Sequence, residues 1–201
     1  MTIEAFGTPQ VPMGLRTNNP VGGKFLSVVL DFAGHSLEHK VPLRCLLPVE
    51  QLPKGMSLCS VWEAGRLSHN TGAAVDDPEA HGGQAWQAVP GKHPRETHLA
   101  WGPYEELPPG RYAVAFRLKA ERQGEAPVAR LDVFNFWLSQ EGKDGTYAQR
   151  ILRPKDRAQS GRYADFWLDF EHGRTGKVEY RVWWPGNSPL SLNRVVVFRK
   201  P

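Results

Sequence analysis

Three stretches of this chain place a large apolar residue at every second position, and this pattern constrains the fold more than any other feature. They lie at 112–120, 164–170 and 177–184. Their apolar positions are Tyr112, Val114, Phe116 and Leu118 in the first, Phe166, Leu168 and Phe170 in the second, and Val178, Tyr180, Val182 and Trp184 in the third. A period of two is that of a β-strand with one buried face. Apolar residues at helical spacing are nearly absent, so the sequence predicts strands.

Further strands and turns complete the pattern. Strand candidates lie at 25–32, 41–47, 56–62, 84–89, 97–101, 128–138, 147–152 and 190–198. Pro-Pro-Gly at 108–110 and Pro-Gly-Asn at 185–187 favour tight turns between strands. Many short strands joined by turns predict an all-β, jelly-roll-like β-sandwich. Residues 64–83 and 90–96 are interpreted as long loops, which on such scaffolds often carry function.

The length and the cysteines bear on domain organisation. A chain of 201 residues buries about 70% of the surface that its unfolded form exposes, so it needs no disulfide or metal to fold. We expect an N-terminal arm with additional strands at 1–56, extended over 1–23, and the sandwich at 57–201. Cys45 and Cys59 lie in apolar runs, which predicts buried free thiols. The sequence also allows a disulfide between them.

The charge is uneven along the chain. Residues 1–110 hold 8 Lys/Arg and 11 Asp/Glu, whereas 111–201 hold 17 and 10. The basic residues are interspersed with acidic and apolar ones, so no nucleic-acid partner is expected. A denser run, from Arg150 to Arg162, is interpreted as a solvated loop, with an acidic polysaccharide as the alternative partner. No stretch is long and apolar enough for a membrane span. The N-terminus lacks signal-peptide features, which favours either the cytoplasm or a domain of a longer exported chain.

Catalytic motifs are missing. There is no G-x-S-x-G, no P-loop and no cysteine beside an obvious histidine partner. Asp165 and Asp169 share one face of a predicted strand, and a carboxylate pair can serve glycoside hydrolysis. Solvated strand carboxylates are far commoner, so we do not expect an enzyme. Seven histidines lack metal-site spacing, and surface positions are expected for them.

The aromatic residues are more informative. Trp167 alternates with aspartates and Trp183 with Glu179 and Arg181, so both are expected on polar faces. Trp101 and Tyr104 lie at one strand end, and Trp137 ends another predicted strand. An exposed tryptophan leaves a large apolar area in water unless something covers it. In the simpler interpretation a neighbouring loop or the N-terminal arm covers each tryptophan. In the alternative interpretation a sugar ring of a bound ligand covers it.

A resemblance to a known family enters at 62–86. Glu63-Ala64 followed by Asp77, Ala80 and Gly82-Gly83 resembles the opening of carbohydrate-binding modules of the family 6 and family 35 type. The segments at 107–120 and 178–197 are similar to the family's Pro-x-Gly-x-Tyr strand and its closing hairpin. The resemblance spans roughly 58–199. It implies a non-catalytic jelly roll, often appended to a glycan-active enzyme.

The resemblance also implies positions for ligands. An edge site would involve Trp86, Trp137 and Asn187, whereas alternation nominates Trp167 and Trp183 for a site on a sheet face. Such modules often hold a structural calcium ion, for which Glu63 and Asn193 are the matching positions. Gly65 replaces the family's second glutamate there, and Asn193 replaces an aspartate. Because affinity for calcium rises with the number of carboxylates, any calcium here is expected to be weak and structural, and no cofactor is required.

The sequence thus predicts a module that binds a glycan through exposed aromatic residues and one amide side chain: Trp86, Trp101, Tyr104, Trp137, Trp167, Trp183 and, as the amide, Asn187. The alternative is a protein-interaction or assembly module that uses the N-terminal arm and the same aromatics, with a protein partner or a parent enzyme. A glycan hydrolase or lyase is the third hypothesis. The glycan itself is not specified by the sequence.

Overall fold

The computed structural model describes residues 13–18, 25–32, 35–42, 54–121, 125–156, 161–173 and 176–201. The chain divides into two compact units, residues 1–47 and 48–201. In the first unit, β1 (Met13–Asn18), β2 (Phe25–Phe32) and β3 (His35–Pro42) pair in that order as an antiparallel sheet. The predicted strand at 25–32 is confirmed, whereas the expectation of an extended arm over 1–23 misses the strand at 13–18.

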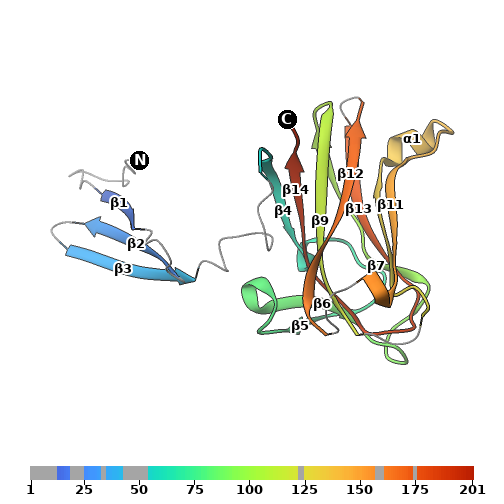
Figure 1. The fold of residues 1–201 in the computed structure, drawn as a ribbon, viewed down its shortest axis with the longest axis horizontal. Coiled ribbons are helices and arrows are strands. Elements are labelled where there is room, and N and C mark those ends of the chain that lie inside the picture. The colour runs from blue at the N-terminus through green and yellow to red at the C-terminus, as the bar shows by residue number, and fades with distance from the viewer. Residues whose placement is uncertain are drawn as a thin grey trace. The chain divides into compact units, whose positions relative to one another are not determined.

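The second unit is a β-sandwich of two antiparallel sheets (Figure 1). One sheet has the strand order β12-β9-β14-β6-β5, and β4 also pairs with β14. Its strands are β4 (Ser57–Glu63), β5 (Ala73–Asp76), β6 (Gln84–Ala88), β9 (Gly110–Ala120), β12 (Tyr163–His172) and β14 (Leu190–Arg199). We call this sheet the β9 sheet.

The second sheet, called here the β13 sheet, has the order β11-β10-β13-β7, and β8 also pairs with β13. Its strands are β7 (Thr97–Ala100), β8 (Pro103–Leu107), β10 (Ala129–Phe134), β11 (Thr146–Leu152) and β13 (Gly176–Trp184). The helical turns among the described residues are η2 (Ala64–Arg66), η3 (His81–Gly83), α1 (Phe136–Gln140) and η4 (Pro154–Asp156). The all-β prediction is therefore confirmed.

The core lies between the two sheets and is built from the alternating apolar residues. The predicted inward residues of β9, β12 and β13 all belong to one buried cluster. Trp184, Tyr112, Tyr180 and Phe116 are among its largest fully buried side chains. Burial of apolar area contributes roughly 25 cal/mol per Å², so this alternation accounts for why these segments form paired strands with a fixed register.

Several predicted boundaries were wrong. The strand expected over 128–138 ends at Phe134, and the short helix α1 follows. The Asn135 side chain causes this break, because its Oδ1 accepts hydrogen bonds from the backbone N–H groups of Trp137 and Leu138, at 3.0 and 3.3 Å. The expected loop at 64–83 contains β5, and β8 was not predicted.

Two smaller expectations also fail. Cys59 is exposed rather than buried. It lies among the three exposed residues that begin β4, where the register with β14 is irregular. Cys45 lies outside the described residues. Arg150 belongs to β11 rather than to a loop, and its Nη1 donates to the Trp167 carbonyl at 3.5 Å.

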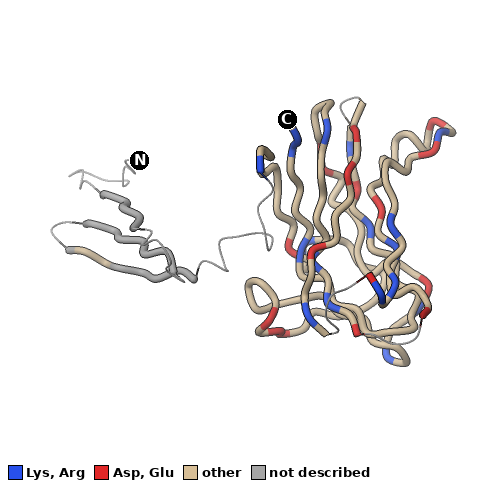
Figure 2. Tube along the Cα trace, viewed as in Figure 1, with Lys and Arg blue, Asp and Glu red and all other residues tan. Residues whose placement is uncertain are grey.

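Charged residues of both signs are interspersed along the strands of the second unit (Figure 2). This distribution agrees with the interspersed basic residues of the sequence. In the part of the chain that the structure describes, no helix is long and apolar enough to cross a membrane.

Candidate functional site

The outer face of the β13 sheet carries polar and aromatic side chains together. Strand alternation that sends Val133, Tyr180 and Val182 into the core sends their neighbours outward. The antiparallel register sets Phe134 opposite Glu179, and Asp132 opposite Arg181. These outward residues form the floor of the site.

A pocket of about 300 Å³ opens on this face. We call it the aromatic pocket, and its lining residues are Asn70, His98, Trp101, Tyr104, Phe134, Phe136, Ser139, Glu179 and Arg181. They come from β7, β8, the connection between these two strands, β10, β13, α1 and the loop that precedes β5. The site is therefore assembled from segments that are far apart in the sequence.

Aromatic rings follow one another at nearly right angles around this pocket. The Trp101 and Tyr104 ring centroids are 5.9 Å apart at 89°, and those of Tyr104 and Phe136 are 6.4 Å apart at 88°. Trp137 continues the series, 5.8 Å from Phe136 at 75°. Tyr104, Phe136 and Trp137 are 38%, 37% and 51% exposed. Large apolar side chains grouped in this way on a surface are typical of a binding site.

Local backbone features hold these rings in place. The Asn135 cap described above begins α1 and thereby positions Phe136 and Trp137. Trp101 pairs with Ser68 in an isolated β-bridge, and its Nε1 donates to Asn70 Oδ1 at 3.3 Å. Tyr104 has a φ of 66°. A residue with a side chain seldom adopts this conformation, and such strain concentrates at functional sites.

The polar floor is organised around Asp132, which is 1% exposed. Arg181 Nε donates to its Oδ1, and the Arg130 Nε lies 3.9 Å from its Oδ2. The Arg181 guanidinium also lies 3.7 Å from the centroid of the Phe134 ring. Burial raises the pKa of Glu179, opposed by Arg181 and reinforced by Asp132. Burial lowers the pKa of His98, with Arg181 acting in the same direction, so its neutral imidazole is favoured.

Trp183 extends this face beyond the pocket. Its ring meets the His98 ring edge to face at 5.1 Å, and the Arg130 guanidinium lies 5.1 Å from its centroid. Trp167 shares the outer face of the other sheet with the strand aspartates, but it is partly buried there in a small apolar cluster, and its ring centroid lies 5.6 Å from that of Phe198. Trp183 and Trp167 therefore do not form one site.

The residues of the expected edge site are also apart. Strands β10 and β13 are antiparallel, and Trp137 follows the end of β10 whereas Asn187 follows the end of β13. The two residues thus lie at opposite ends of this strand pair. Asn187 is exposed, and its Nδ2 donates to the Pro127 carbonyl at 2.8 Å.

Trp86 lines a different pocket, called here the Trp86 pocket, of about 510 Å³. One face of its indole stacks on the His69 ring, with centroids 3.7 Å apart, and its Nε1 donates to the Thr71 carbonyl at 2.8 Å. Glu63 and Asn193 line the same pocket. The structure therefore brings together Trp86 and the two expected metal ligands, but not Trp86 and Trp137.

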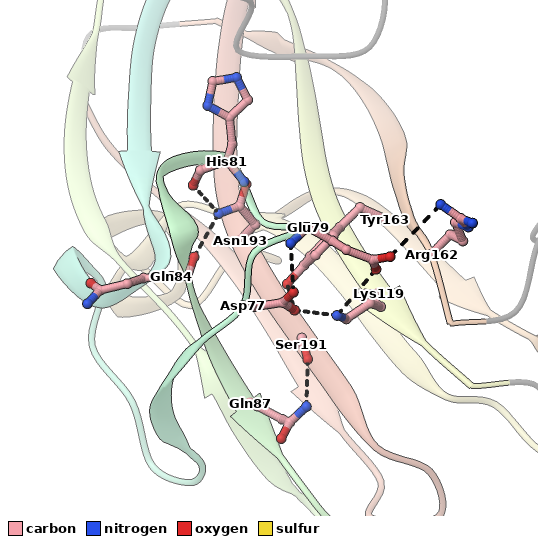
Figure 3. Close-up of polar contacts among 10 residues, drawn as sticks. All are labelled: Asp77, Glu79, His81, Gln84, Gln87, Lys119, Arg162, Tyr163, Ser191 and Asn193. Carbon is pink, nitrogen blue, oxygen red and sulfur yellow. Dashed lines mark hydrogen bonds and ion pairs between the residues drawn. The ribbon is translucent and has the colours of Figure 1, made fainter. Parts of the chain in front are cut away.

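The side chains around Asn193 do not fit a calcium ion. Asn193 Nδ2 donates to the carbonyls of His81 and Gln84, both at 2.9 Å, and its Oδ1 accepts from the His81 N–H at 3.2 Å (Figure 3). Glu63 pairs with Arg194 at 3.0 Å. Burial raises the pKa of the Glu63 carboxyl, and Arg194 opposes that rise. The amide and the guanidinium thus use the oxygens that a calcium ion would need.

Sequence reasoning missed several members of the aromatic pocket. Phe136 fell inside a predicted strand, and Asn70 and Ser139 carried no signal in the sequence. Glu179 and Arg181 were recognised as sharing a face with Trp183, and that alternation was the available signal. Because Trp101 and Tyr104 meet Phe136 through tertiary contacts, their grouping could not be read from spacing.

Comparison with known proteins gave matches among solved structures. No protein-family model matches the chain, and no curated protein sequence matches it. A family 6 carbohydrate-binding module of the Cellvibrio mixtus lichenase 5A, solved with cellotriose, is 12% identical, with 72% of this chain and 99% of that one covered and a TM-score of 0.47.

Two multi-domain enzymes also match. A Clostridium thermocellum endo-1,4-β-D-xylanase, containing a family 22 carbohydrate-binding module and solved with xylohexaose, is 12% identical, with 73% and 26% covered and a TM-score of 0.46. An exo-β-1,3-galactanase of Phanerochaete chrysosporium with galactose is 13% identical, with 86% and 41% covered and a TM-score of 0.47. The chain thus spans less than half of either enzyme chain. The lichenase module belongs to family 6, one of the two families that the sequence resemblance named.

Proposed function

We propose that residues 48–201 form a glycan-binding module whose ligand lies in the aromatic pocket on the outer face of the β13 sheet. The observation that carries this proposal is the series of exposed rings of Tyr104, Phe136 and Trp137 beside buried polar groups. The sequence resemblance to carbohydrate-binding modules supports it.

The chemistry of the pocket suits a sugar. A sugar ring presents C–H groups on its faces and hydroxyl groups around its rim, so it needs a flat apolar partner and hydrogen-bonding groups at the side. The aromatic series supplies the first. Asn70, Glu179 and Arg181 supply the second. Small-ligand sites commonly combine aromatic walls with a few polar groups in this way.

Binding without hydrolysis is the activity that we propose. Glycoside hydrolysis uses two carboxyl groups on opposite sides of the scissile bond. On this face Asp132 is nearly inaccessible and lies between two arginines. Glu179 is then the carboxyl that remains for a ligand in the pocket. One carboxyl group favours recognition over cleavage.

A glycan screen tests the proposal. The wild-type protein is expected to bind at least one oligosaccharide, and Tyr104→Ala and Trp137→Ala should each weaken that binding about fivefold or more, since stacking contacts of aromatic rings are worth about 1 kcal/mol. Leu58→Ala is the matched control, because Leu58 is a comparably exposed apolar residue on the β9 sheet. An assay for newly formed reducing ends should stay blank with the bound glycan.

The result that would overturn the proposal is also clear. If no glycan binds, or if both aromatic variants remain folded and bind as the wild type does, the aromatic pocket is not a sugar site. Release of reducing ends would instead assign a hydrolase or lyase.

A further inference from the structure

Among the residues that the structure describes, no hydrogen bond or ion pair engages the carboxyl group of Glu179. It is 4% exposed and lines the aromatic pocket from β13. Nearby side chains of opposite charge bind elsewhere: Arg181 Nε donates to Asp132, and Lys177 pairs with Glu106 at 3.7 Å. The oxygens of Glu179 are not among the fully enclosed polar atoms of the described residues, so they face the pocket, where a ligand can supply the donors.

Arg181 offers the complementary chemistry at the same place. Its Nε is engaged by Asp132, and its guanidinium plane lies over Phe134. Among the described residues no hydrogen bond engages its two terminal amino groups. Arg181 also lines the pocket. Because Asp132 holds the Nε edge of the guanidinium and Phe134 covers one face, the terminal amino groups can donate hydrogen bonds only in a direction that the protein sets.

The charges near the pocket balance. Arg130 and Arg181 carry two positive charges, and Asp132 and Glu179 carry two negative charges when both are ionised. The neighbouring His98 favours its neutral form, because burial lowers its pKa. A net charge on this face would favour a ligand of opposite sign, and none is present here. The carboxylate of an acidic sugar would be repelled by the unpaired Glu179, and the ammonium group of an amino sugar would be repelled by Arg181.

We propose that Glu179 and Arg181 together recognise adjacent hydroxyl groups of a neutral sugar, with Glu179 accepting their hydrogen bonds and Arg181 donating to their oxygens. This inference rests on the proposed function and narrows it to uncharged glycans. Glu179 and Arg181 are then the residues that determine specificity, while the aromatic rings supply stacking that differs little between sugars. The titratable or charged groups near Glu179 are Arg181, Asp132, Tyr104, His98 across the pocket, and Lys177 two residues away on β13.

Matched oligosaccharides provide the first test. Two matched sets of β-1,4-linked hexamers serve as probes, together with whichever glycans the screen identifies. The first set contains hexamers of glucose, glucuronic acid and glucosamine. The second contains hexamers of mannose and mannuronic acid. Within each matched set the neutral hexamer, or the neutral screen ligand, is expected to bind at least about tenfold more tightly. Tighter binding of an acidic or amino form overturns this inference and leaves the proposed function standing. Failure of every glycan to bind overturns the proposed function instead.

Variants of Glu179 provide the second test. Glu179→Gln keeps the size of the side chain but loses the charge, and it should weaken binding of the neutral ligand about tenfold or more, as for a charged hydrogen bond. Glu171→Gln is the control, since Glu171 is exposed on β12 of the other sheet. The melting temperature of each variant shows that it is folded.

The pH profile separates recognition from a structural role. Because burial raises the pKa of Glu179, wild-type affinity should fall as the pH is lowered through that pKa, when the carboxylate gains a proton. Glu179→Gln should lack this step. A folded Glu179→Gln protein that binds as tightly as the wild type, or that retains the step, would overturn the assignment of Glu179.

Discussion

The Arg181 guanidinium lies 3.7 Å from the centroid of the Phe134 ring, across the pairing of β13 and β10. In the register, Arg181 is directly opposite Asp132 and diagonal to Phe134. A diagonal neighbour in a sheet is within reach of a long side chain. The cation thus rests on a ring at the floor of the aromatic pocket, and its orientation is fixed before any ligand arrives.

Removing the Phe134 ring should leave the Arg181 guanidinium less firmly oriented at the floor of the aromatic pocket. Phe134→Leu keeps an apolar side chain of similar size but removes the cation–π contact, which is worth about 0.5–2 kcal/mol according to its solvation. Glycan affinity is expected to fall about threefold or more, as measured by titration calorimetry. Ile151→Ala is the control, because Ile151 is exposed on β11 of the same sheet. Equal affinities of wild type and Phe134→Leu would contradict the prediction.

The Asn135 cap should contribute to both stability and binding. Asn135→Ala removes the acceptor for the N–H groups of Trp137 and Leu138, and also the donor to Tyr147 OH at 2.8 Å. Loss of a cap costs about 1–2 kcal/mol in the free energy of unfolding. Asn135→Asp retains the capping oxygen and should bind glycan better than Asn135→Ala. Chemical denaturation and titration measure the two effects, and an Asn135→Ala protein with unchanged affinity would show that α1 does not need the cap.

Asp77 should make stability depend on pH. Its carboxylate accepts from Lys119 Nζ, from Tyr163 OH at 2.9 Å and from the Glu79 N–H at 3.0 Å (Figure 3). Although burial raises its pKa, these hydrogen bonds outweigh burial and lower the pKa below its usual value. The ionised form is thus favoured by folding, so its contribution is present above the unfolded pKa of about 3.9 and is lost as the pH falls through the lower, folded pKa.

Replacing Asp77 by asparagine tests the direction in which its contribution to stability changes with pH. Asp77→Asn should lower the free energy of unfolding by about 1–3 kcal/mol at pH 7 and by less below about pH 3. Asp76→Asn is the matched control, because the neighbouring Asp76 is exposed. Urea unfolding at both pH values gives the comparison. A destabilisation by Asp77→Asn that is equal at the two pH values would contradict the assigned role of the charge.

Calcium should have little effect on this protein. Asn193 is fully hydrogen-bonded and Glu63 is paired with Arg194, so we expect millimolar calcium and a chelator to give melting temperatures within about 1 °C of each other. Asn193→Asp replaces the amide by a carboxylate that faces two carbonyl oxygens, and should create a calcium-dependent rise. A large calcium shift in the wild type, absent from Glu63→Gln, would show that a metal displaces the Arg194 contact.

The alternation of residues such as Val114, Phe116 and Val182 determined most of the fold. Each sequence neighbour in a strand points to the opposite face, so a large apolar residue at every second position dictates which face is buried, whatever strand lies next to it. This local signal is why β9, β12 and β13 and the face of each strand that enters the core could be predicted. The ends of strands were harder to predict from the sequence, because the break after Phe134 depends on the side-chain cap of Asn135.

The candidate site was decided by tertiary structure. Sequence alone placed Trp183 on the same face as Glu179 and Arg181, since those residues share one strand. It could not place Tyr104 beside Phe136, nor separate Trp167 from Trp183, because strand order and sheet membership depend on long-range pairing. The period of two specifies a face within a strand and carries no information about which strands become neighbours, and the aromatic pocket exists only where such neighbours meet.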